Sequence, residues 1–127
     1  MYSFSTTIIG DYESVKGRTI AALQDQGFGV LTEIDVKATM KKKLDKDLRP
    51  YIILGACNPA LAYQAVTAES DIGLLLPCNV VVREEENGQI TVAFMDPQAV
   101  LSLVGKPEIE SMAEEVRNKL QKVMAAI

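Results

Sequence analysis

Apolar and polar positions alternate along this chain in short segments that are the length of ordinary strands and helices. Alternation, or a short apolar and β-branched run between turn residues, predicts a strand. The segment 51–56 is apolar on both faces, which places it inside a sheet. Pro77 interrupts the pattern, because proline cannot sit in a central ladder. The predicted strands are 2–9, 28–34, 51–56, 72–76, 79–84 and 89–95.

Between most of the predicted strands, apolar residues recur at helical spacing, and capping residues mark where each helix begins. Aspartate or asparagine is a preferred N-cap, and proline is favoured at the first helical position. Gly27 is predicted to end one of these segments in a left-handed conformation, and Gly105 to close another. The Asn87–Gly88 pair predicts a hairpin with positive φ at both central residues. The helix starts are Asp11, Asp35, Asn58-Pro59, Asp96-Pro97 and Pro107.

This order of elements predicts the α+β class, with one mixed, largely antiparallel sheet and helices packed on one face. The chain has 127 residues, of which 48% are hydrophobic and 24% charged. That length and balance are typical of one globular domain, which we assign to residues 1–127. No apolar stretch is long enough to span a membrane, and the first residues lack the basic start of a secretory signal. We therefore expect a cytoplasmic protein with free thiols.

Charge and residue usage exclude several function classes. The net charge is −4, which argues against a nucleic-acid partner because phosphate contacts need clustered cations. One basic segment, from Lys37 to Arg49, is interpreted as a solvated helix face. The chain contains no histidine, which excludes Ser-His-Asp and Cys-His catalysis within it. An enzyme is therefore less favoured than a binding protein, and no cofactor is indicated.

Two near-mirror tripeptides hold both cysteines: Cys57-Asn58-Pro59 and Pro77-Cys78-Asn79. Cys57 precedes a predicted helix N-terminus, where unpaired amides and the helix dipole would favour a thiolate and lower its pKa if the sulfur faces those amides. The simpler interpretation is a small apolar residue buried at a strand end. If the two predicted strands are neighbours, paired thiolates would suit a soft ion such as Cu(I), or a reversible disulfide.

Glu33 is the other candidate, because it stands in an otherwise apolar strand. A carboxyl group there would have a raised pKa and could act as an acid or a base. The alternative is that the strand end lies in water. Asp35 shares a face with Glu33 and is interpreted as a helix cap. The methionines are interpreted as core residues. The candidate ligand-binding residues are Glu33, Cys57, Asn58, Cys78 and Asn79, with Cys57 and Cys78 as weak metal candidates.

Three ordered segments, 27–36, 50–59 and 75–82, resemble the prokaryotic domain-of-unknown-function family numbered three hundred and two. The resemblance covers nearly the whole chain and ends in the Met95-Asp96-Pro97 turn and the last helix. It implies a compact α+β domain with a topology similar to the TATA-binding protein, and a homodimer, but no established activity. The family's motif positions correspond to Glu33, Cys57, Asn58, Pro59, Pro77, Cys78 and Asn79.

Three functions remain open at this point. The first is a non-enzymatic, ligand-binding or regulatory homodimer whose small-molecule site lies where the Cys57 and Cys78 strand ends meet Glu33. The second is a thiol-redox or soft-metal protein that uses the two cysteines. The third is a purely structural dimer. None of them involves a nucleic acid or a membrane.

Overall fold

Five strands form one sheet in the computed structural model, which describes residues 1–127. The spatial order is β1-β5-β4-β3-β2, and every neighbouring pair is antiparallel. The α+β class is therefore confirmed, but the sheet is not mixed, because every pair that hydrogen-bonds runs in opposite directions. The strands are β1 (Ser3–Ile8), β2 (Gly29–Asp35), β3 (Tyr51–Cys57), β4 (Cys78–Glu84) and β5 (Ile90–Met95).

The helices begin at the residues that the capping pattern predicts. The side chain of Asp11 accepts from the Ser14 amide at 3.0 Å, and that of Asp35 accepts from the Ala38 amide at 2.9 Å. Each bond satisfies an amide that the first helical turn leaves unpaired. The helices are α1 (Tyr12–Asp25), α2 (Val36–Leu44), α3 (Pro59–Ala68), α4 (Pro97–Leu101) and α5 (Pro107–Ala125), with short 3-10 helices η1 (Ser70–Leu75) and η2 (Ser102–Val104).

Two local predictions are wrong. Most of the segment predicted as a strand over 72–76 belongs to η1. The Ile72 amide, for example, donates a hydrogen bond to the Glu69 carbonyl three residues earlier, at 3.1 Å. Only one of the apolar side chains of η1, that of Ile72, is buried, so the apolar run does not mark a strand inside the sheet. In the β4–β5 hairpin, Gly88 has φ of 84° but Asn87 does not enter the positive region. A single left-handed glycine is enough to close this turn.

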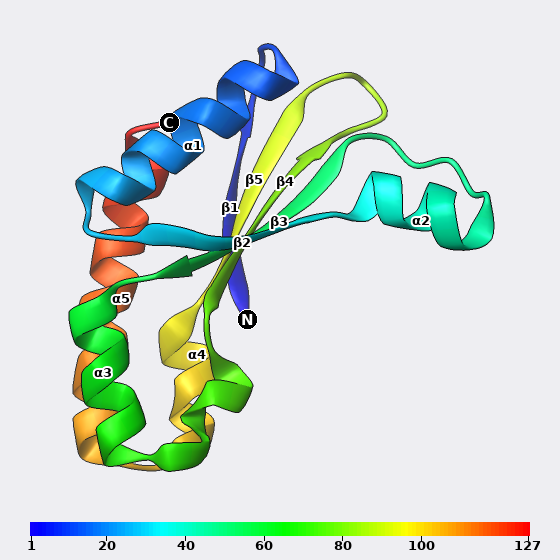
Figure 1. Ribbon diagram of the computed structural model, residues 1–127. Coiled ribbons are helices and arrows are strands. Elements are labelled where there is room, and N and C mark those ends of the chain that lie inside the picture. The colour runs from blue at the N-terminus through cyan, green and yellow to red at the C-terminus, as the bar shows by residue number, and fades with distance from the viewer.

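The hydrophobic core lies between one face of the sheet and the helices α1 and α5 (Figure 1). Alternate residues of the three inner strands point into it, including Leu54, Val80 and Phe94. Because the strands are in register, Leu54 lies opposite Val80 and Val80 lies opposite Phe94. Phe94 also stacks on Phe4 of the edge strand, with ring centroids 5.5 Å apart. This continuous apolar row holds the sheet under its helices.

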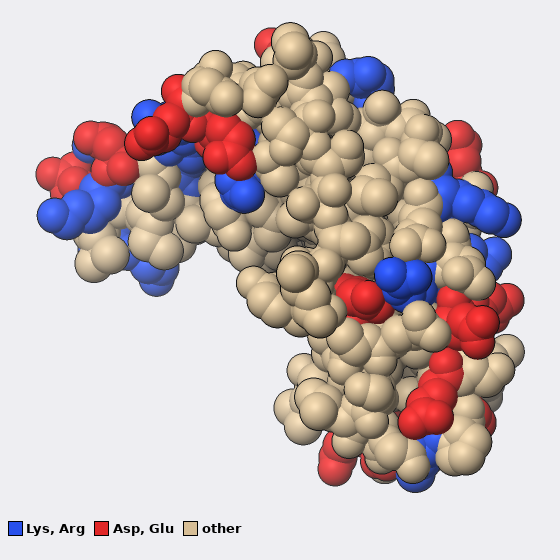
Figure 2. Space-filling view, turned by 180° about the vertical axis from the view of Figure 1, so that it is seen from behind, with Lys and Arg blue, Asp and Glu red and all other residues tan.

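The opposite face of the sheet carries no packed helix, and α2 projects away from the rest of the molecule (Figure 1). No residue of α2 is buried. In Figure 2, charged side chains gather on this projecting arm and along the opposite margin, and the surface between them is largely uncharged. None of the helices combines the length and apolar character needed to cross a membrane.

Gly55 permits a close approach of three segments beside the ends of β3 and β4. A Cβ atom at this position would lie 2.3 Å from Thr32 Oγ1 and 3.0 Å from Pro77 Cγ. We expect Gly55→Ala to lower the free energy of unfolding by about 1–3 kcal/mol, the usual cost of overpacking. Gly29→Ala is the matched control, because a Cβ there meets nothing within 4 Å. Equal denaturant midpoints for the two variants would contradict the prediction.

Candidate functional site

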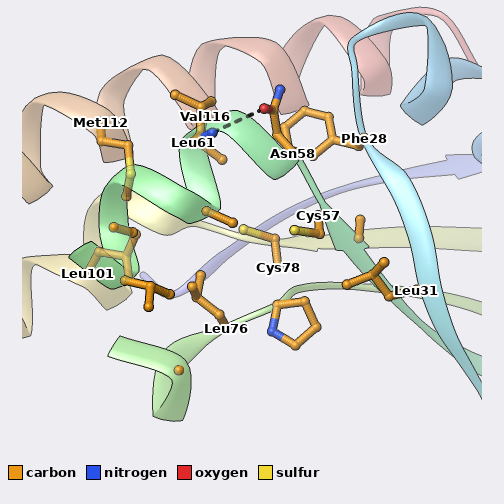
Figure 3. Close-up of a pocket in the computed structure, with 16 residues that line it drawn as sticks. Phe28, Leu31, Cys57, Asn58, Leu61, Leu76, Cys78, Leu101, Met112 and Val116 are labelled. Atoms are coloured by element: carbon orange, nitrogen blue, oxygen red, sulfur yellow. Dashed lines mark hydrogen bonds between the residues drawn. The ribbon is translucent and has the colours of Figure 1, made fainter. Parts of the chain in front are cut away.

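A pocket of about 260 Å³ lies where the end of β3 and the start of β4 meet α3 and α5 (Figure 3). Hydrophobic residues make up 13 of the 16 that line it. Its lining contains no charged side chain. The lining residues are Phe28, Leu31, Ala56, Cys57, Asn58, Leu61, Ala62, Ala65, Val66, Gly73, Leu76, Pro77, Cys78, Leu101, Met112 and Val116.

The pairing of β3 with β4 brings both cysteines to this pocket. Ala56 lies directly opposite Cys78 in the antiparallel ladder, and Cys57 follows as the last residue of β3. The two strands are therefore neighbours, which the sequence had left open. Figure 3 shows the two sulfur atoms on the same side of the strand ends, close to the pocket interior. No disulfide joins them in the structure.

Asn58 turns the chain from β3 into α3 and thereby forms one wall of the pocket. Its side-chain oxygen accepts a hydrogen bond from the Leu61 amide at 3.3 Å, and Pro59 occupies the first helical turn. The predicted N-cap is therefore confirmed. Because the oxygen of Asn58 is used by the helix, this residue contributes more to the wall than to recognition.

The pocket has a buried floor and an open rim. Phe28, Ala65 and Leu101 are almost completely buried and form the floor. The side chains of Leu31 and Val66 are 65% and 49% exposed and lie at the rim. A molecule could therefore enter through the open rim and move from water into an apolar interior.

The electrostatic environment keeps the two thiols protonated. Burial, and to a lesser extent the negative charge of an ionised Cys57, raise the pKa of Cys78 to about 11. Burial also raises the pKa of Cys57. This contradicts the expectation that the N-terminus of α3 would lower the pKa of Cys57. Loss of hydration is the cause, because a thiol in apolar surroundings becomes a weaker acid.

The structure does not bring the other two candidate residues to the pocket. Glu33 lies opposite Leu54 on the edge strand β2, where its carboxylate is 3.3 Å from the Lys16 ammonium. It is exposed, so the alternative interpretation, a strand in contact with water, describes it. Asn79 is exposed and follows Cys78, so strand alternation directs it to the opposite face of the sheet. Cys57, Asn58 and Cys78 are therefore together, and Glu33 and Asn79 are apart from them.

Comparison with known proteins identifies the family. The family model described as "Domain of unknown function DUF302" matches residues 4–127. The chain belongs to the DUF302 family. Its fold is similar to that of a crystal structure of an uncharacterized conserved DUF302 protein from Bacillus stearothermophilus, with a TM-score of 0.91 and 24% identity over 99% of this chain and 98% of that one. No protein with a curated description matches this chain.

Several pocket residues of this DUF302 domain were not expected from the sequence. Met112 and Val116 belong to the apolar stripe of α5, which was interpreted as core, and Leu101 lies in α4. The stripe of α5 predicts only that a side chain faces inward. Whether it then meets another side chain or a cavity depends on the packing of α3 and α4. The structure contains no group of three or more His, Cys, Asp or Glu side chains that could hold a metal ion.

The raised pKa of Cys78 predicts slow alkylation at neutral pH. In Cys57→Ser, which leaves Cys78 as the single thiol and keeps burial, the larger cause of its raised pKa, the rate of reaction with iodoacetamide should keep rising above about pH 9. The thiolate is the reacting species, so the rate follows its population. For the same variant unfolded in denaturant, the rate should become constant once the pH exceeds the ordinary thiol pKa of about 8.5. Circular dichroism would confirm that the protein is folded at each pH, and a native rate already constant by pH 9 would contradict the prediction.

Proposed function

We propose that this DUF302 domain is a non-enzymatic binding protein for a small, neutral, apolar molecule that occupies the pocket between α3, α5 and the ends of β3 and β4. The observation that carries the proposal is a cavity of about 260 Å³ in which 13 of 16 lining residues are hydrophobic. Protein interiors are normally close-packed, so a hollow of this size leaves apolar surface without contacts. An apolar ligand would restore those contacts, whereas water would find few polar partners there.

The chemistry of the lining favours binding over catalysis. No carboxylate or amine lines the pocket, so it offers no charged group for proton transfer. The alternative, a thiol-redox or soft-metal protein, depends on Cys57 and Cys78. Both groups have raised pKa values, and the thiolate is the form that attacks a disulfide or binds a metal. The raised pKa values therefore count against the thiol-redox or soft-metal alternative, and they favour a pocket that carries no charge.

A pocket-blocking variant tests the proposal. Ala62 is half-buried and lines the pocket, whereas Ala60 lies on the same helix, is exposed and does not. We expect Ala62→Phe to weaken the binding of octan-1-ol and 4-phenylbutan-1-ol by about tenfold or more, because the ring takes the ligand's space. Ala60→Phe should bind as the parent does. Titrations followed by heteronuclear NMR give both the dissociation constants and the residues that shift.

Two results would contradict the binding function. One is that neither alcohol binds the parent at millimolar concentration. The other is that the alcohols bind but shift the amides of residues remote from the pocket, with equal affinity in both variants. Thermal unfolding of each variant confirms that the comparison is made between folded proteins.

We also propose that the domain is a homodimer. The support is a patch of exposed apolar side chains at the end of the molecule formed by η1 and η2, where Leu74 is 86% exposed and Leu103 is 79% exposed. Both side chains line one shallow hollow. Exposed apolar clusters of this kind mark contact surfaces, and two-fold pairs are the commonest assembly.

Light scattering tests this assembly. At micromolar concentration the mass should be about twice 13.8 kDa. The double substitution Leu74→Ser and Leu103→Ser should return it to the monomer mass, because the apolar contact is lost. The Leu48→Ser variant on the projecting arm serves as a control for an exposed leucine elsewhere. A parent mass of one chain that persists as concentration rises would refute the dimer.

A further inference from the structure

Three sulfur atoms from three separate elements line the same pocket. Cys57 ends β3, Cys78 begins β4 and Met112 belongs to α5. Figure 3 shows their sulfur atoms around the interior of the pocket, with the Phe28 ring at one side. The chain has only two cysteines and five methionines, so three of its seven sulfur-containing residues line this one pocket. The sequence separation of these residues means that only the fold brings them together.

Sulfur is the most polarizable atom that side chains offer to an apolar ligand. Thioether and thiol sulfurs make favourable contacts with aromatic rings, most often at the ring edge, where the hydrogens carry partial positive charge. A saturated ring lacks this edge polarity and gains only the general apolar contact. Because the raised pKa values keep Cys57 and Cys78 neutral, their sulfurs contribute this contact without the cost of burying a charge.

The size of the pocket sets a limit on the ligand. An apolar cavity of about 150 Å³ is enough to admit benzene. The pocket of about 260 Å³ therefore holds one such ring with a short chain of roughly four further heavy atoms. The rim at Leu31 and Val66 is also apolar, so the end of the chain would lie against apolar side chains, where a neutral hydroxyl loses less hydration than an anion does.

We propose that the pocket selects neutral aromatic molecules, namely a single aromatic ring that carries a short aliphatic chain, over saturated molecules of the same size. This selection rests on the proposed binding function and specifies its ligand class. The sulfurs of Cys57, Cys78 and Met112 supply the discrimination, and the remaining lining supplies general apolar affinity. The absence of any charged side chain in the lining excludes an anion from the interior, because a buried carboxylate would have no partner.

Three probes with one carbon skeleton separate these effects: 4-phenylbutan-1-ol, 4-cyclohexylbutan-1-ol and 4-phenylbutanoate. Apolar area alone favours the cyclohexyl compound, because its saturated ring is the more hydrophobic. We expect the phenyl alcohol to bind about tenfold more tightly than the cyclohexyl alcohol, and the anion to bind about tenfold or more weakly than the phenyl alcohol. Isothermal titration calorimetry gives the three dissociation constants.

Met112→Leu removes one sulfur while nearly conserving side-chain volume. It should reduce the preference for the phenyl alcohol by about threefold and leave the affinity for the cyclohexyl alcohol unchanged. Met124→Leu is the matched control, since Met124 lies on the same helix but not in the pocket. Cys57→Ala, at a half-buried position, is a second variant should Met112→Leu unfold, and it too should lower the preference.

The outcomes distinguish the two proposals. If none of the probes binds, the binding function itself fails. If the cyclohexyl alcohol binds as tightly as the phenyl alcohol, the pocket binds apolar molecules without selecting aromatic ones, and only the present inference is overturned. The same holds if both Met112→Leu and Cys57→Ala keep the parent preference. Tighter binding of 4-phenylbutanoate than of the phenyl alcohol would overturn the requirement for a neutral ligand.

Discussion

The antiparallel pairing of β3 with β4 is the contact on which the rest of the site depends. It sets Ala56 against Cys78, and so brings the last residue of one strand and the first residue of the next to the same place. Gly55 is required beside this pairing, because a Cβ atom there would clash with the Thr32 hydroxyl on β2 and lie 3.0 Å from Pro77 Cγ before β4. A shift of one residue would reverse the face of every side chain in the ladder and separate the cysteines from the pocket.

The pocket exists because the helices on this face do not cover the strand ends completely. α1 and α5 cover one face of the sheet, while α3 begins directly after the end of β3 and lies beside α5 beyond the strand ends (Figure 1). The side chains available there are small, including Ala56, Ala62 and Ala65, and small side chains leave volume unfilled. Filling such a volume with a ligand would stabilise the folded state by mass action, as binding to the native state does in general.

Burial also decides what the two cysteines can do. In water each thiol would ionise partly near neutral pH, and a pair of them would suggest redox chemistry. In this apolar lining the protonated forms are favoured, and the pKa of Cys78 rises to about 11. The same residues therefore act as neutral, polarizable surface. The asparagines next to the cysteines do not alter this apolar environment. The side-chain oxygen of Asn58 accepts a hydrogen bond from the Leu61 amide, and Asn79 faces the other side of the sheet.

The sequence by itself determined the α+β class, most element boundaries and the caps at Asp11, Asp35 and Asn58, because these depend on residues within a few positions of one another. It could not show that 72–76 forms η1, since an apolar run has the same appearance in a strand and in a turn whose one inward side chain, Ile72, is buried. It also could not show that Glu33 lies apart from the two thiols, or that Met112 lines the same pocket as they do. Those placements are set by strand order and by the packing of α3 and α5, which bring residues distant in the chain together and leave a cavity between them.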